Sequence, residues 1–116
     1  MTVIKRNGKI EKLSKKKISD SINNANLSSS EDERLTIKQI NRIVDSIVTF
    51  CETQEEPIDI DILENIIEKK IMENGAYEVA KRYITYRYEK ERIRQNKNIT
   101  EKLMAKNVQN QNANVD

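Results

Sequence analysis

The chain has 116 residues, a formal net charge of +2, no histidine and one cysteine, Cys51. That length suits a single domain with a modest core, and two glycines and one proline are too few for the many turns of an all-β fold. The cysteine and histidine counts exclude an internal disulfide, a Cys/His zinc site and a histidine-based catalytic triad. The near-neutral charge predicts no general affinity for nucleic acid. The single cysteine predicts a reduced, cytoplasmic setting, and the lack of a long apolar run predicts no membrane span and no signal peptide.

Residues 2–13 predict a β-hairpin. Val3 and Ile4 form a short β-branched run, and residues 9–13 return with a partly alternating pattern. The Asn7-Gly8 pair between them is the strongest short hairpin signal, because both residues tolerate a positive φ. A lone hairpin is marginal in water, so we expect it to pack on the rest of the domain.

Four helices follow in the pattern of caps and apolar residues. The first is expected to begin after Ser14, the second after Thr36, with Gln39 completing a capping box, and the third after Asp61. The fourth is expected from about Tyr77 to Arg94. A polar loop is expected at 27–35 and an extended segment at Ile58–Ile60. Gly75 is a helix stop of the left-handed type. The predicted fold is mainly α (α+β): a four-helix bundle capped by a small N-terminal β-hairpin or three-stranded sheet.

Composition changes beyond Gln95, where Asn and Gln become frequent. This predicts two regions, a folded domain over residues 1–94 and a loosely held linker over 95–116 that leads into a further domain, with a short helix at Thr100–Lys106.

Basic residues crowd the hairpin and the start of the first helix. Lys5 and Arg6 precede the turn, and the run 15–17 is all lysine. Lysines in a first helical turn oppose the helix dipole unless an anion offsets them, so this region is a candidate phosphate site. The alternative, that the lysines form only a solvated face, stays open at this point.

Other candidates have simpler explanations. Glu11, the lone acid among the cations, is either an ion-pair partner or an acceptor for a ribose hydroxyl or a base amino group. Asp59 and Asp61 are expected to be a helix cap and a solvated neighbour, not metal ligands. Cys51 lies on the apolar face of the second helix and predicts core packing. Of the tyrosines, Tyr83 and Tyr88 are expected in or beside the core.

Three separated segments resemble the ATP-cone family. They are VIKRNGKIEKLSKKKI at 3–18, IDILENIIEKKIMENG at 60–75 and YEVAKRYITYRYEKER at 77–92. The sequence departs from the common family pattern at Asn7, where Asp is frequent, and at Leu13-Ser14, where Phe-Asp is common. The resemblance implies an allosteric domain of a ribonucleotide reductase that binds ATP to activate the enzyme and dATP to inhibit it, with Mg²⁺ left open as a companion of the triphosphate.

By position, the resemblance implies a set of nucleotide contacts. These are Val3, Lys5, Arg6, Glu11, Ser14, Lys17, Ile18, Asp59, Ile62, Leu63 and Lys90. The cations at 5, 6, 17 and 90 would hold phosphates, and the residues at 11 and 14 would be polar partners. The remaining residues would border or approach the base. No catalytic residue and no metal ligand is implied.

The last segment, NQNANVD at 110–116, resembles the junction into the catalytic domain of anaerobic, glycyl-radical, class III ribonucleoside-triphosphate reductases. This implies such a reductase as the parent enzyme, with no reductase activity in these 116 residues. The implied partners are the parent's catalytic domain and a homo-oligomer formed with dATP. Two alternatives remain: the ATP-cone of a transcriptional repressor of reductase genes, which would need a cysteine quartet elsewhere, and a plain helical interaction module.

Overall fold

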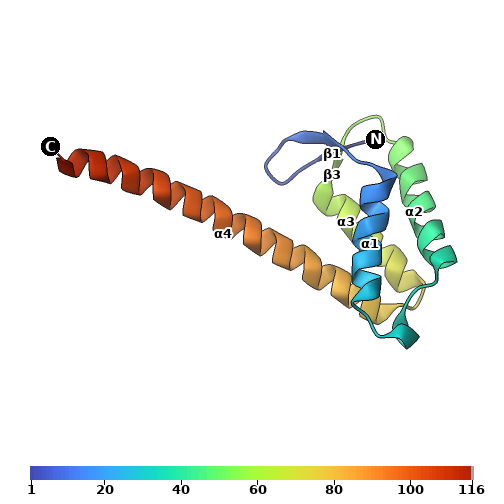
Figure 1. Ribbon diagram of the computed structural model, residues 1–116. Helices are drawn as coiled ribbons and strands as arrows, with labels where there is room; N and C mark the ends of the chain where they lie inside the picture. The colour runs from blue at the N-terminus through green and yellow to red at the C-terminus, as the bar shows by residue number, and fades with distance from the viewer. Residues whose placement is uncertain (116) are drawn as a thin grey trace. The chain divides into compact units, whose positions relative to one another are not determined.

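The computed structural model describes residues 1–115, apart from the side chains of 94, 98 and 106–115. The elements run β1 (Thr2–Ile4), β2 (Ile10–Lys12), α1 (Lys15–Leu27), the 3-10 helix η1 (Glu31–Glu33), α2 (Ile37–Glu52), β3 (Ile58–Asp59), α3 (Ile60–Glu73) and α4 (Tyr77–Val115). The chain forms two units, Met1–Ile84 and the remainder of α4 from Thr85 onward. The predicted architecture, four helices with a small N-terminal sheet, is confirmed (Figure 1).

The three strands form one sheet in the order β2-β1-β3. β1 pairs antiparallel with β2, with Val3 opposite Glu11, and parallel with β3, with Val3 opposite Ile58. Residues that lie opposite one another share a face of the sheet, so these three residues point the same way. Val3 and Ile58 belong to the core, and that face is therefore the one turned toward the helices.

The hairpin turn differs from the one expected. Only Gly8 has a positive φ, of 82°, whereas Asn7 does not. Gly8 N donates to Lys5 O at 2.8 Å and Lys5 N donates to Lys9 O at 2.8 Å, which closes a three-residue loop over residues 6–8. Asn7 Oδ1 accepts from Lys9 N at 3.0 Å, so the side chain of Asn7 stabilises the loop without a positive φ. This geometry puts Arg6 in the loop.

Helix starts follow the predicted caps with one exception. Ser14 Oγ accepts from Lys17 N at 3.1 Å, and Thr36 begins α2 with a complete capping box. The cap of α3 is Asp59 and not Asp61, because Asp59 Oδ1 accepts from Asp61 N at 2.8 Å. The pairing of β3 with β1 ends at Asp59, so the chain enters the helix there, and the expected extended segment is one residue shorter.

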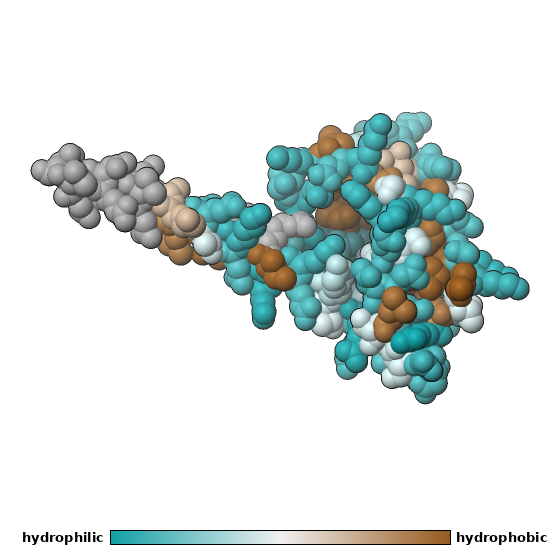
Figure 2. All heavy atoms as spheres, in the orientation of Figure 1, coloured by the Kyte–Doolittle hydropathy of each residue, from teal (hydrophilic) through white to brown (hydrophobic). Residues whose placement is uncertain are grey.

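The core joins the sheet to the apolar faces of all four helices. Its members are Val3, Ile18, Ile22, Ala25, Leu35, Ile40, Ile43, Val44, Ile47, Cys51, Ile58, Leu63, Ile67, Ile71, Ala76, Val79, Ala80 and Tyr83. Burial raises the pKa of the Cys51 thiol above its ordinary value, which disfavours the reactive thiolate. On the face seen in Figure 2, exposed apolar side chains lie among polar ones. None of the described helices is both long enough and apolar enough to cross a membrane.

The last helix is longer than predicted. It continues to Val115, whereas the sequence predicted an end near Arg94 and a separate short helix at 100–106. No glycine or proline follows Gly75, and helix-breaking residues are therefore lacking. Beyond residue 94, side chains still bond to backbone groups four residues earlier, as in a helix: Thr100 Oγ1 donates to Asn96 O at 2.8 Å. The boundary near 94 stays a prediction, and Asp116 lies outside the described residues.

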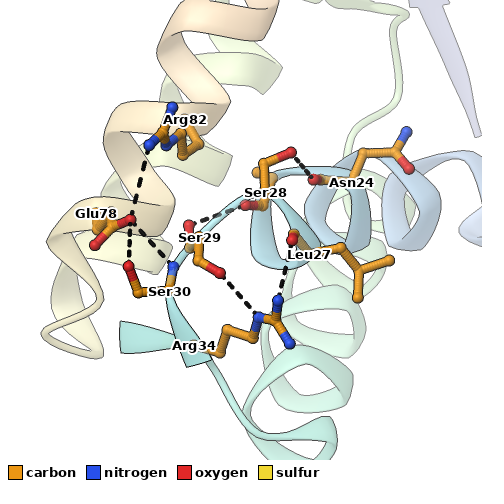
Figure 3. Close-up of polar contacts among 9 residues, drawn as sticks. Asn24, Leu27, Ser28, Ser29, Ser30, Arg34, Glu78 and Arg82 are labelled. Atoms are coloured by element: carbon orange, nitrogen blue, oxygen red, sulfur yellow. Dashed lines mark hydrogen bonds and ion pairs between the residues drawn. The ribbon is translucent and has the colours of Figure 1, made fainter. Parts of the chain in front are cut away.

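The polar loop between α1 and α2 is fixed by side-chain bonds (Figure 3). Glu78 Oε1, from α4, accepts from Ser30 N at 3.1 Å and from Ser30 Oγ at 3.3 Å. Arg34 donates to Ser29 O at 3.0 Å and to Leu27 O at 3.1 Å. The loop is thereby tied to the first turn of α4, within the first unit.

Asn26 closes the same loop from inside the protein, and its removal is expected to be costly. Its buried side chain accepts from Leu35 N at 2.7 Å and donates to Leu35 O at 3.1 Å. Asn26→Ala leaves both backbone groups without these partners, so we expect the free energy of unfolding to fall by about 2–3 kcal/mol in urea denaturation. Asn24→Ala, an exposed change in the same helix, is the control and should stay within about 0.5 kcal/mol. Equal losses in both variants would contradict this role.

Candidate functional site

The loop end of the hairpin is a cluster of ion pairs. Lys5 Nζ lies 3.2 Å from Glu11 Oε2. Arg6 Nη2 lies 3.1 Å from Asp61 Oδ1 and 3.1 Å from Glu64 Oε1, both on α3. Of the predicted site residues, the structure pairs Lys5 with Glu11, whereas Arg6 pairs with acids of α3. It also adds Asp61 and Glu64, which sequence reasoning missed because the contact joins positions more than fifty residues apart.

The three lysines at the start of α1 do not behave alike. Lys15 Nζ lies 2.8 Å from an acid of α2, and Lys16 Nζ lies 3.0 Å from an acid one helical turn further on. Lys17 has no ion pair among the described residues, and its side chain is exposed. The electrostatic conflict expected from three adjacent lysines is thus relieved for two of them within the protein, and Lys17 remains available to an anion.

The two basic groups lie at opposite ends of β2. Lys5 and Arg6 are at the loop, whereas Ser14 and Lys17 follow the strand, at the entry to α1. The three residues of β2 span roughly 10 Å of extended chain. Glu11 lies between the two ends, on the face of the sheet that it shares with Val3. Lys5 Nζ lies beside Glu11, so the charge of Lys5 is carried back from the loop toward the middle of β2. One phosphate chain can touch both groups only if the long side chain of Lys17 also reaches toward Lys5.

Most of the apolar residues expected beside the base are in the core. Val3, Ile18 and Leu63 are buried, whereas Ile62 is exposed on α3. Asp59 is exposed and caps α3. Of the four apolar residues, only Ile62 has a side chain exposed to a ligand. The contacts of the other three with a base stay predictions.

Lys90 and two of the tyrosines belong to the second unit. Lys90 Nζ lies 5.0 Å from the centre of the Tyr86 ring, within the range of a cation–π contact. Tyr83, in the first unit, is buried as predicted. The expectation that Tyr88 packs in or beside the core is wrong, because it is 71% exposed. It lies beyond Ile84, where the first unit ends.

The structure is thus a small helical domain with a three-stranded sheet, whose basic N-terminal hairpin is tied to α3 by ion pairs. The sequence matches the family model of the ATP cone domain over residues 1–92, and the chain belongs to that family. Members of the family bind ATP or dATP as allosteric ligands.

The chain is also similar to curated proteins of Chlamydia. It is 32% identical over 105 residues to the ribonucleoside-diphosphate reductase subunit alpha of Chlamydia trachomatis, covering 84% of this chain and 10% of that protein. The same figures apply to the subunit of Chlamydia pneumoniae. For Chlamydia muridarum the identity is 39% over 56 residues, covering 48% of this chain and 5% of the relative. The chain thus spans about a tenth or less of the length of these relatives.

These relatives correct one prediction. The sequence was expected to come from an anaerobic, class III ribonucleoside-triphosphate reductase, whereas the similar proteins are ribonucleoside-diphosphate reductases. The class III expectation is therefore wrong. It depended on residues 110–116, a short polar segment whose composition carries little information, and not on the three segments that define the family.

Proposed function

We propose that this chain is the nucleotide-sensing domain of a ribonucleotide reductase, with ATP raising and dATP lowering the activity of the enzyme to which it belongs. The observation that carries the proposal is a pair of anchored cations at the hairpin: Lys5, at the edge of the loop, is ion-paired with Glu11, and Arg6, in the loop, is ion-paired with acids of α3. Membership of the ATP cone family and the reductase relatives support it.

The proposed ligand lies along the hairpin with its phosphates toward the cations. Arginine binds phosphate oxygens through a planar fork, and lysine binds them as a point charge, so Arg6 and Lys5 are suited to a triphosphate. Lys17 adds a third cation beside the free N–H groups at the start of α1. Mg²⁺ bound to the triphosphate is part of the proposal, carried by the nucleotide.

Glu11 is the proposed discriminator of the sugar. ATP and dATP differ by one 2′-hydroxyl group, and a carboxylate can accept a hydrogen bond from that group in ATP alone. The ion pair with Lys5 fixes the position of this carboxylate at the hairpin. A ligand shifts a conformational equilibrium only by its differential affinity for the states, so opposite effects of ATP and dATP require contacts that respond to this one group.

The proposal is tested by isothermal titration calorimetry of the 116-residue chain with dATP, ATP and GTP, each with and without magnesium. We expect saturable heat with both adenine nucleotides and an affinity for GTP at least about tenfold weaker, which corresponds to about 1.4 kcal/mol. An absence of heat at millimolar dATP would contradict the proposal. So would equal binding of all three nucleotides, because that result would describe a general polyanion site.

A further inference from the structure

Arg6 is already occupied before any phosphate reaches it. Its Nη2 contacts carboxylate oxygens of both Asp61 and Glu64 at 3.1 Å, and its side chain is only 18% exposed. Glu64, at 13% exposed, is even less accessible to water. Arginine–carboxylate pairs shielded from solvent are stronger than surface pairs, so a phosphate must displace a substantial interaction to bind Arg6.

The two carboxylates are placed to connect the hairpin with a helix of the core. They are three residues apart in the first turns of α3, and therefore lie on one side of that helix. Leu63, the residue before Glu64, is fully buried in the core. The state of Arg6 is thus linked directly to the position of α3 against its neighbours.

We propose that Asp61 and Glu64 compete with the nucleotide phosphates for Arg6, and that this exchange sets the affinity of the site and releases α3 from the hairpin when nucleotide binds. This inference rests on the proposed function and adds to it two affinity-determining residues that do not touch the ligand. When nucleotide binds, the contacts of Arg6 with the two carboxylates break, and the first turns of α3 are then free to shift.

The test is the affinity for dATP of Glu64→Gln, which keeps the size of the side chain and removes its charge. We expect dATP to bind about three- to tenfold more tightly, because the competing anion is weakened. Asp61→Asn, at a more exposed position, should act in the same direction with a smaller effect. Glu33→Gln on η1 is the matched control: it removes one exposed carboxylate that has no ion pair among the described residues, and its affinity should stay within twofold of wild type.

A double-mutant cycle separates competition for Arg6 from a general change of charge. In an Arg6→Ala background, Glu64→Gln should no longer change the affinity, whereas a long-range electrostatic effect would persist. Unchanged or weaker binding by Glu64→Gln in the wild-type background would overturn the inference, because the carboxylates would then hold Arg6 in place for the phosphate. The two possible failures have different results. If wild type binds dATP but Glu64→Gln does not bind it more tightly, only this inference fails; if wild type binds no adenine nucleotide, the proposed function fails with it.

Discussion

Replacing Lys5, Arg6 and Lys17 together with alanine should weaken dATP binding by at least about 100-fold, or about 2.8 kcal/mol. Each of these cations offers a charge-assisted hydrogen bond to a phosphate, and such bonds contribute about 1.5–3 kcal/mol each. Lys5 and Arg6 also give up ion pairs when they bind, so the net loss is expected to be smaller than the sum. Isothermal titration calorimetry of the triple variant gives the affinity directly.

A matched control separates the site from the overall charge. Lys38, Arg42 and Lys69 are exposed cations on α2 and α3, and their replacement by alanine removes the same charges from elsewhere in the first unit. This control should keep an affinity within about threefold of wild type, since exposed charges that make no direct contact with the ligand are weakened by salt screening. Circular dichroism confirms that both variants stay folded. Similar affinities in the two triple variants would mean that the hairpin cations do not form the site.

The local features of the fold could be predicted because each has its cause in neighbouring residues. Ser14 and Thr36 cap helices through bonds that reach only three residues along the chain. Gly75 ends α3 with a positive φ of 74°, as its position predicted. The apolar positions of α2 recur at helical spacing, and the structure buries Ile40, Ile43, Val44, Ile47 and Cys51. Signals of this kind need no knowledge of the tertiary fold.

The candidate site was less accessible to sequence reasoning because its contacts are non-local. The charge of Arg6 predicts an anionic partner, but not that the partner is a pair of carboxylates on α3, since Glu64 is 58 positions away. The same limit applies to the choice between Asp59 and Asp61 as the cap, which the pairing of β3 with β1 decides. Patterns predicted the elements, and tertiary contacts decided what each side chain can reach.

Replacing Ile47 with alanine should lower the free energy of unfolding by about 3–4 kcal/mol. Ile47 is 0% exposed on α2, in the core shared by the four helices. Removing three carbon atoms there loses apolar burial and leaves a cavity, and a domain of this size has only about 5–15 kcal/mol of stability in total. Urea denaturation measures the loss, with Ile37→Ala, 78% exposed on the same helix, as the control within about 0.5 kcal/mol.

The same two variants also test whether the nucleotide site depends on the core as a whole. A ligand that binds only the folded state adds stability according to its concentration and Kd. If Ile47→Ala leaves the hairpin cluster intact, saturating dATP should stabilise Ile47→Ala, Ile37→Ala and wild type by the same increment. A smaller increment in Ile47→Ala alone would mean that the loosened core misplaces α3, and with it the Asp61 and Glu64 carboxylates that hold Arg6. Equal losses of stability in the two isoleucine variants would instead contradict the burial of Ile47.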